Sequence, residues 1–388
     1  MFSRRVPDDR APTRVARALE AARTRGPLLD LTISNPTRAG IPYPADLLDA
    51  LADPAALVYR PEPFGLEDAR AAVADTYARR GLAIDRERIV LTASTSEAYS
   101  ILFKLLCDPG RSDVLTPAPS YPLFDHLASL DGVGQRRYPL EYHGAWTIDT
   151  ASLDRVWSGH TRAVLAVSPN NPTGSVLTGA DADELASRCA ERDAALIVDE
   201  VFWDYPLRDP FVEPPALRAP RCLVARLGGL SKSAGLPQVK LGWIALDGPD
   251  DVVAEALERL ELIADTYLSV STPVQVAART LLRRAGPVRD AILARVRGND
   301  AALRRLAGAS AIVDVLPADG GWSAVLRVPA TRSEEALVLE LLERDAVVTH
   351  PGYFFDFAHE AFLVISLLPE PDVFARGAAR ILERVDAA

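Results

Sequence analysis

The sequence predicts an α/β protein with a large domain, in which a mostly parallel sheet is flanked by helices, and a smaller α+β domain. Short apolar runs alternate with amphipathic stretches through the middle of the chain, which is typical of βαβ units. Turn residues follow most of the apolar runs. After the Gly-Gly pair at 320–321 the chain returns to strand and helix patterns, which indicates a second domain.

Six strands are predicted in the middle of the chain, each as a short apolar run that ends in polar or turn residues. They cover Ile89–Thr92, Asp113–Thr116, Ala163–Val167, Ala195–Val198, Leu223–Leu227 and Leu241–Leu246. Amphipathic periodicity predicts helices at Ser96–Cys107, Tyr121–Leu130, Ala180–Arg192 and Asp251–Ala264. Because ligands of parallel sheets bind at the carboxyl ends of the strands, we expect the functional residues there.

Both ends of the chain are predicted to form the smaller domain. A Pro-rich stretch at 35–44 precedes the first strand, and two helical stretches over 273–307 follow the last one. The tail continues with a strand at Trp322–Val328, a helix at Glu334–Glu343 and a strand at Ala361–Leu367. We therefore place the large domain at 46–285 and the small domain at 1–45 and 286–388.

Composition excludes several classes of function. The 388 residues carry a net charge of −10 with no long basic run, which disfavours binding to nucleic acid or to a membrane surface. No apolar stretch is long enough to span a membrane, and the N-terminal segment has charges but no apolar core, so it predicts a frayed or docked arm rather than a signal peptide. Three widely spaced cysteines indicate a reducing, cytoplasmic location, and the histidines lack metal-ligand spacing.

Lysine is rare in this chain. Only three of the 43 basic residues are lysines, namely Lys104, Lys232 and Lys240. Lys232 follows an apolar strand in a Gly/Ser segment, and a low-polarity environment there would keep its amine partly neutral and able to form a Schiff base. The alternative is a solvated loop lysine. A phosphate-binding P-loop does not fit, because Ser231 stands where that motif needs glycine.

Two more strand ends carry polar groups that suit a pyridine ring. Asp199 ends the run Ala-Ala-Leu-Ile-Val, where a buried carboxylate needs a partner such as a pyridinium N–H. Its alternative is a helix-capping or turn aspartate. Asn171, in Asn-Pro-Thr-Gly, can hold a ring oxygen through its side-chain amide, or it can belong to an ordinary Pro-Gly turn.

A phosphate site and an aromatic complete the set. The Ser-x-x-Glu pattern at 94–97 is a capping box, and the helix that it opens can present the N–H groups of Thr95 and Ser96 to a phosphate. A capping box without further function is the alternative. Tyr121, in Pro-Ser-Tyr-Pro, can stack on an aromatic cofactor or can pack in the core.

An anion site, an amide, a buried carboxylate and a lysine together suit pyridoxal 5′-phosphate. Their order and spacing resemble those of the class I/II aminotransferases, which are fold-type-I pyridoxal-phosphate enzymes, over roughly residues 30–385. The resemblance implies that Lys232 is the Schiff-base lysine and proton shuttle. It implies that the large domain binds the cofactor through Thr95, Ser96, Tyr121, Asn171, Asp199, Ser231 and Lys240. It also implies a homodimer in which Tyr59 reaches the partner subunit's phosphate.

Three departures from the family pattern concern the cofactor. Lys240 stands where the family usually has a phosphate-binding arginine, which keeps the charge but loses the bidentate fork. Phe202 stands where the family usually has a tyrosine, so the ring oxygen loses a donor. Tyr59 and Gly65 are one residue further apart than the family pattern.

A fourth departure concerns the substrate. Val364 stands where the family usually has an arginine that binds the substrate's α-carboxylate. One alternative is that the match to the family pattern is shifted along this strand. Otherwise Arg38 and Arg327 are the candidate replacements, unless the substrate lacks such a carboxylate.

The resemblance implies an amino-group transfer between an amino acid and a 2-oxo acid. The same scaffold supports other reactions, so a pyridoxal-phosphate-dependent lyase or cyclase acting on an amino acid is the alternative. An inactive relative that only binds the cofactor is a further alternative. The sequence alone does not choose the amino donor and acceptor.

Overall fold

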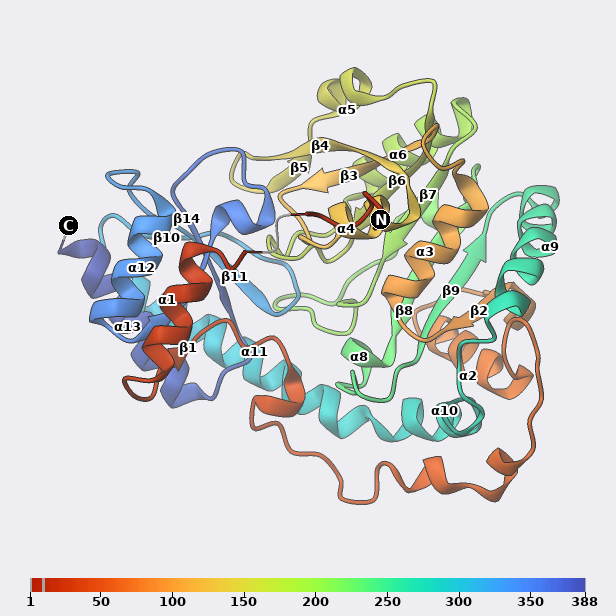
Figure 1. Cartoon of the computed structure of the whole chain (residues 1–388), viewed down its shortest axis with the longest axis horizontal. Helices are drawn as coiled ribbons and strands as arrows, with labels where there is room; N and C mark the ends of the chain where they lie inside the picture. The colour runs from red at the N-terminus through yellow and green to blue at the C-terminus, as the bar shows by residue number, and fades with distance from the viewer. Residues whose placement is uncertain (1, 9–10, 388) are drawn as a thin grey trace.

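An eight-stranded sheet organises the larger half of the structure, a computed structural model in which residues 2–8 and 11–387 are described (Figure 1). Its strands are β2 (Ile89–Thr92), β3 (Asp113–Ala118), β4 (Gly134–Tyr142), β5 (Trp146–Ile148), β6 (Thr161–Val167), β7 (Ala195–Asp199), β8 (Val224–Gly229) and β9 (Gly242–Asp247). Their order in the sheet is β2-β9-β8-β7-β6-β3-β4-β5. The neighbours from β8 to β4 pair in parallel, whereas β9 and β5 run antiparallel to theirs.

The central strands of this sheet are buried on both faces. Leu165 and Ile197 pack into one apolar cluster, and their neighbours Val164 and Leu196 pack into another on the opposite face. Burial on both faces explains why β6, β7 and β8 read as continuous apolar runs instead of alternating ones. The predicted α/β class with a mostly parallel sheet is therefore confirmed, and the six predicted strands lie within two residues of their expected bounds.

Helices flank the large sheet. Those of the larger half are α2 (Glu67–Ala78), α3 (Thr95–Leu106), α4 (Phe124–Asp131), α5 (Thr150–Val156), α6 (Gly179–Glu191), α7 (Pro215–Arg218), α8 (Leu230–Ser233), α9 (Asp250–Tyr267) and α10 (Thr272–Arg284). Capping side chains start two of them, and the first of these caps was predicted from the sequence. Ser94 Oγ accepts from Glu97 N at 3.1 Å before α3, and Thr178 with Asp181 forms a capping box at α6.

The smaller half is built around a four-stranded antiparallel sheet with the order β10-β11-β14-β13. These strands are β10 (Asp314–Val315), β11 (Ser323–Arg327), β13 (His350–Pro351) and β14 (Phe362–Ser366). Two short strands, β1 (Leu29–Asp30) and β12 (Val347–Val348), form a separate parallel pair. The helices here are α1 (Arg14–Arg23), α12 (Glu334–Arg344) and α13 (Pro371–Asp386). Residues from both chain ends thus contribute to this half (Figure 1).

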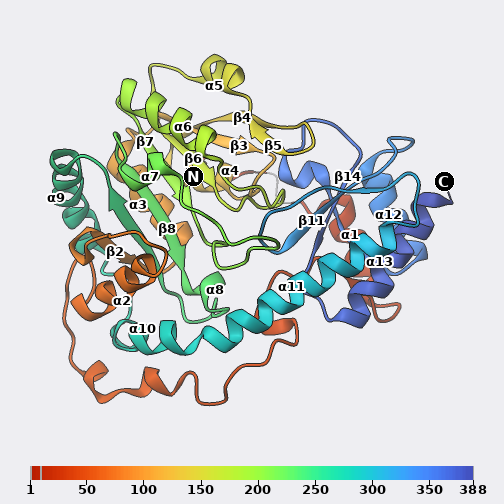
Figure 2. The same cartoon turned by 180° about the vertical axis from the view of Figure 1, so that it is seen from behind.

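One long helix connects the two halves. Helix α11 (Gly286–Ala307) runs along one side of the molecule from α10 to the smaller sheet (Figure 2). Short 3-10 turns occur at 36–38, 49–52, 54–57, 86–88 and 352–355. The described residues 2–8 dock on the end of α4, since Arg5 Nη1 donates to Leu130 O at 3.1 Å and Ser129 Oγ donates to Arg5 O at 3.1 Å. The predicted arm also includes residues 1, 9 and 10, which lie outside the described residues.

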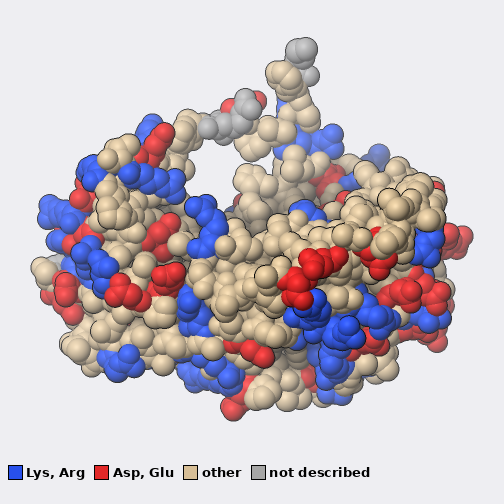
Figure 3. Space-filling model, turned by 90° about the horizontal axis from the view of Figure 1, so that it is seen from below, with Lys and Arg blue, Asp and Glu red and all other residues tan. Residues whose placement is uncertain are grey.

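The surface of the molecule agrees with the charge balance of the sequence. On the face drawn in Figure 3, basic side chains are intermixed with acidic ones instead of gathering into one patch. Among the described helices, none combines the length and the apolar character needed to cross a membrane.

Candidate active site

The carboxyl ends of the central strands bring the predicted segments together at one edge of the sheet. Asp199, the last residue of β7, lies between Val167 of β6 and Leu227 of β8. Gly242 of β9 pairs with Gly229 on one side and with Thr92 on the other. The segments that follow β2, β6, β7 and β8 therefore emerge next to one another, as the sequence predicts for a parallel sheet.

Lys232 lies in the short helix α8, between the large sheet and α11 (Figure 2). Its carbonyl accepts a hydrogen bond from Tyr205 Oη at 2.5 Å, which fixes the backbone. Its amine nitrogen lies 5.0 Å from the ring centre of Trp322 and 5.6 Å from that of Phe202. Burial beside these rings lowers the pKa of Lys232, and the nearby charge of Asp199 opposes the shift. A partly neutral amine is what a Schiff-base lysine requires.

The Asp199 carboxylate is buried, with 6% of the residue exposed. Tyr99 Oη donates to its Oδ2 at 2.9 Å, and Val201 N donates to its Oδ1 at 3.1 Å. Burial raises the pKa of Asp199 to about 6, whereas these two hydrogen bonds and the charge of Lys232 favour the ionised form. A buried carboxylate of this kind is stabilised by a further N–H donor.

The predicted anion site lies at the start of α3. Gly242 approaches this helix so closely that a Cβ atom on it would lie 2.8 Å from the carbonyl carbon of Ser94 and 3.0 Å from Thr95 N. Ala93 N donates to the Glu97 carboxylate at 2.5 Å, whereas in the expected capping box the donor would be the backbone N–H of Ser94 itself, so this cap is a variant. The first turn of α3, with Thr95 and Ser96, is thus held by both a cap and a tight backbone contact.

Two of the remaining predicted residues, Asn171 and Tyr121, are partly buried. Asn171 Oδ1 accepts from Ser323 Oγ at 3.2 Å, which ties the large half to β11. The ring of Tyr121 meets Phe124 edge-on at 5.7 Å. Burial raises the pKa of Tyr121, and the charge of Asp199 adds to the effect, so the two side chains are close enough to interact electrostatically.

Ser231 and Lys240 lie on adjoining segments. Leu230 N donates to Leu241 O at 2.9 Å, so the residue before Ser231 contacts the residue after Lys240. Ser231 is partly buried, whereas Lys240 is exposed and has a left-handed backbone with a φ of 62°. The charge of Lys240 is therefore available next to the Lys232 loop.

Tyr59 lies apart from these groups in its own chain. It is 69% exposed and borders a small hollow that Ile101 of α3 and Tyr267 of α9 also line. Its predicted role, toward the partner subunit, therefore stays a prediction.

The region around Val364 is apolar. Val364 is 2% exposed, pairs with Val325 across the smaller sheet, and packs with Trp146 and Phe357. A carboxylate would be poorly stabilised there without a donor.

The two replacement arginines differ in their surroundings. Arg327 ends β11 four residues beyond Ser323, about 13 Å along a strand, and binds Asp314 at 2.5 Å. This pairing argues against it as the carboxylate donor. Arg38 is exposed on the 3-10 turn at 36–38.

A buried charge network behind the strand ends was not predicted. Arg226 is 0% exposed, and its Nη1 lies 2.6 Å from both Glu200 Oε1 and Glu213 Oε1. Arg80 binds the same two carboxylates at 2.8 and 3.2 Å. The sequence signal was a lone arginine inside the apolar run of β8. Because Glu200 follows Asp199 directly, the network fixes the backbone at the end of β7.

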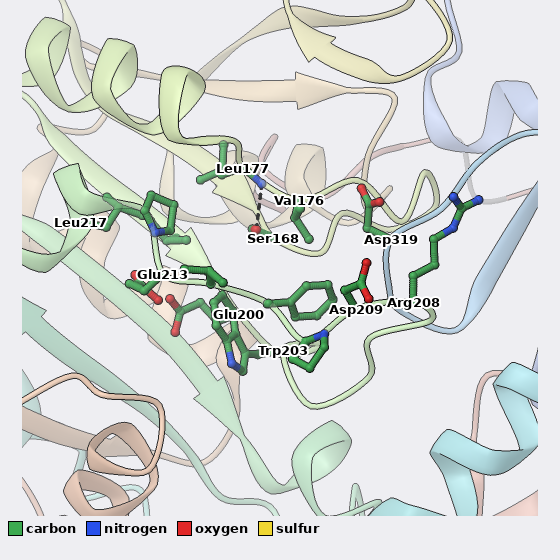
Figure 4. Close-up of a pocket in the computed structure, with 15 residues that line it drawn as sticks. Ser168, Val176, Leu177, Glu200, Trp203, Arg208, Asp209, Glu213, Leu217 and Asp319 are labelled. Carbon is green, nitrogen blue, oxygen red and sulfur yellow. Dashed lines mark hydrogen bonds between the residues drawn. The ribbon is translucent and has the colours of Figure 1, made fainter.

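This network borders a separate hollow of about 360 Å³. Figure 4 shows Glu200 and Glu213 on one side of it, and Arg208 and Asp319 on the other. Its lining residues do not include Lys232, Asp199 or the start of α3, so it is distinct from the candidate site.

The residues of this site have the chemical groups needed to bind pyridoxal 5′-phosphate. The absence of a side chain at Gly242 keeps a Cβ atom away from Thr95 N at the start of α3, where an anion can bind, and Asp199 offers a buried carboxylate to a ring N–H. Lys232 offers an amine of lowered pKa. Tyr99 and the Arg226 network are parts of the site that the sequence analysis missed, since both depend on tertiary contacts.

Comparisons with known proteins agree with this chemistry. Residues 30–381 match the family described as aminotransferase class I and II. Alanine aminotransferase of Mycobacterium tuberculosis is 28% identical over 370 residues, covering 92% of this chain and 84% of that protein. S-alkyl-thiohydroximate lyase of Arabidopsis thaliana is 31% identical over 226 residues, covering 57% and 48%. The structure of alanine aminotransferase from Pyrococcus furiosus shares the fold with a TM-score of 0.89 at 20% identity and 100% coverage of both chains. The chain therefore belongs to the class I and II aminotransferases, enzymes that move an amino group between an amino acid and a 2-oxo acid.

Proposed function

We propose that this chain is a pyridoxal-phosphate-dependent transaminase in which Lys232 carries the cofactor. The observation that supports this most is the amine of Lys232, which lies near the rings of both Phe202 and Trp322 at the carboxyl edge of the sheet and has a lowered pKa. Bound there, the cofactor would supply an electron sink for the bond that breaks at the substrate's α-carbon.

Different residues around Lys232 would bind different parts of the cofactor. Thr95, Ser96, Ser231 and Lys240 would hold the phosphate, through the N–H groups of the α3 N-terminus and the ammonium group of Lys240. Asp199 would keep a proton on the ring nitrogen, Asn171 would bind the ring oxygen, and Tyr121 would stack on the ring. Phe202 offers no hydroxyl to the ring oxygen, so Asn171 would carry that contact alone.

Lys232 would also act as the proton shuttle. Once substrate occupies the site, the amine of Lys232 is free. It would then accept the proton from the substrate's α-carbon and deliver it to the cofactor atom that takes up the amino group's bond. The rings of Phe202 and Trp322 lie near this amine, and burial lowers its pKa, which favours the neutral form that a general base needs.

Substrate assignment follows from the relatives as a working hypothesis. The relatives named alanine aminotransferase and glutamate-pyruvate aminotransferase make alanine with 2-oxoglutarate and glutamate with pyruvate the first pairs to test.

One further candidate function has a specific observation in its favour. A relative that matches 57% of the chain is named a lyase, so elimination from an amino acid is the alternative. The test is to mix the loaded enzyme with one amino acid and no acceptor. Transamination converts the cofactor stoichiometrically to pyridoxamine phosphate, whereas elimination leaves it in the aldehyde form and releases ammonia.

We also propose that the chain forms a homodimer with Tyr59 directed to the partner subunit. Leu57, Val58 and Tyr59 are 88%, 60% and 69% exposed, and Leu262 and Tyr267 on α9 are 74% and 55% exposed. A group of large apolar side chains exposed in this way is typical of an interface.

The domain boundaries at 46–285, and at 1–45 with 286–388, remain part of the proposal. The connecting helix α11 begins at Gly286, at the expected boundary. The cytoplasmic location also remains a prediction from the cysteine content.

A further inference from the structure

The hydroxyl of Tyr99 connects two parts of the candidate site that lie far apart in the sequence. Tyr99 is 1% exposed, and its Oη donates to Asp199 Oδ2 at 2.9 Å across 100 residues of sequence. The rings of Phe124 and Phe103, at 5.3 and 6.2 Å, hold its ring in place. The orientation of the hydroxyl is thus fixed by packing.

Tyr99 also shares a helix face with the phosphate site. It lies four residues after Thr95 and three after Ser96 in α3, spacings that place side chains on one face of a helix. A single rigid helix therefore presents an anion site in its first turn and a donor to Asp199 in its second. Because Gly242 presses against the start of α3, the helix cannot shift without moving both contacts.

Few groups other than Tyr99 contact the Asp199 carboxylate and fix its orientation. Its Oδ1 accepts from Val201 N at 3.1 Å, and Oδ2 has the bond from Tyr99. The titratable groups that act on it are Tyr99 from α3, Tyr121 from the segment before α4, the adjacent Glu200 and Lys232 from α8. Of these, only Tyr99 donates a hydrogen bond to it among the described residues.

We propose that Tyr99 is a positioning residue for the cofactor: its hydroxyl orients the Asp199 carboxylate and keeps the shared proton on the ring nitrogen. A donor to the carboxylate stabilises its ionised form and lowers its affinity for the proton. Without that donor, the proton shifts toward Asp199 and the ring loses positive charge. This inference rests on the proposed function, because it assumes that the cofactor binds at Asp199.

The test compares Tyr99→Phe with Tyr138→Phe in the cofactor-loaded protein. Tyr138 is an equally buried tyrosine, 1% exposed, whose Oη donates to the backbone oxygen of Leu165 at 2.7 Å. Each variant loses one buried hydroxyl, and both are expected to lower the melting temperature by a similar amount. The measurements are the dissociation constant for pyridoxal phosphate and the pH at which the visible absorbance band of the bound cofactor titrates.

For Y99F we expect roughly tenfold weaker cofactor binding, because the Asp199 carboxylate is no longer held in one orientation toward the ring N–H. We also expect the absorbance band to titrate at higher pH, because a ring with less positive charge repels a second proton less. Y138F is expected to match the wild type in both measurements. In an Asp199→Asn background, Y99F is expected to leave the titration unchanged.

Three results would overturn the inference. One is Y99F matching Y138F in both measurements, and another is the same shift persisting in the Asp199→Asn background. The third is a Y99F chain that fails to fold while Y138F folds, which would make the role structural. A wild-type chain that takes up no cofactor overturns the proposed function as well, so the two failures are distinguishable.

Discussion

Gly242 lies so close to Thr95 that the two segments admit no side chain between them: a Cβ atom on Gly242 would lie 3.0 Å from Thr95 N. We therefore predict that Gly242→Ala displaces the first turn of α3 and weakens binding of the cofactor's phosphate, by tenfold or more in the dissociation constant. Helix N-termini bind phosphate through N–H groups whose directions must be kept. Equilibrium titration with pyridoxal phosphate measures the effect.

The matched control for this change is Gly298→Ala in the middle of α11. A Cβ atom there meets nothing within 4 Å, and alanine stabilises a helix relative to glycine by up to about 1 kcal/mol. Gly298→Ala should leave cofactor affinity unchanged. If the Gly242→Ala variant bound the cofactor as tightly as the wild type does, α3 would not hold the phosphate.

Asp199 predicts a particular pH dependence of stability in the cofactor-free chain. Its folded-state pKa is raised to about 6 from 3.8, so the folded chain binds more protons than the unfolded chain between these values. The stability contributed by this group is therefore present at low pH and is lost as pH rises through about 6. Two pKa units correspond to about 3 kcal/mol.

Replacing Asp199 by Asn removes this loss. We predict that the free energy of unfolding of the cofactor-free Asp199→Asn variant, measured relative to wild type, rises by about 3 kcal/mol as the pH is raised from 4 to 7. Urea denaturation at a series of pH values measures it, with Asp183→Asn, which removes a 69%-exposed carboxylate, as the control. Parallel pH profiles for wild type and Asp199→Asn would contradict the burial-induced shift.

The exposed apolar group around Tyr59 predicts the oligomeric state. Wild type should sediment at twice the chain mass of 41.9 kDa, and Leu57→Asp should shift it toward the single-chain mass because it places a charge in the interface. Val212→Asp places the same charge at a residue 80% exposed elsewhere, and it should leave the dimer intact. A wild-type chain that sediments as a monomer would remove the proposed role of Tyr59.

The sequence predicted the central sheet well because its strands are buried on both faces. Continuous apolar runs such as the one in Ala195–Asp199, when they alternate with helices, predict the parallel strands of a sheet that helices cover on both faces. Strand β4, with the sequence Gly-Gln-Arg-Arg-Tyr-Pro-Leu-Glu-Tyr, was not predicted, because most of it is exposed or half-exposed and only Tyr138 is fully buried. Helices α1, α2, α5 and α13 were also missed.

Those site residues were predictable whose role can be recognised from their type and their local sequence alone. Lys232 is one of three lysines, and Asp199 ends an apolar run, so both stood out in the sequence. Tyr99 did not, because its meaning depends on a contact across 100 residues with Asp199. Arg226 was equally hidden, since only the fold places Glu200 and Glu213 around it.

The most direct test of the central claim is to locate the cofactor covalently. The chain is saturated with pyridoxal phosphate, treated with borohydride and digested, and the peptides are weighed by mass spectrometry. We predict a single reduced adduct on Lys232 in the wild type and none in the Lys232→Ala variant, which should also lose turnover. An adduct on Lys104 or Lys240 in place of Lys232, or no adduct at any of the three lysines, would contradict the account.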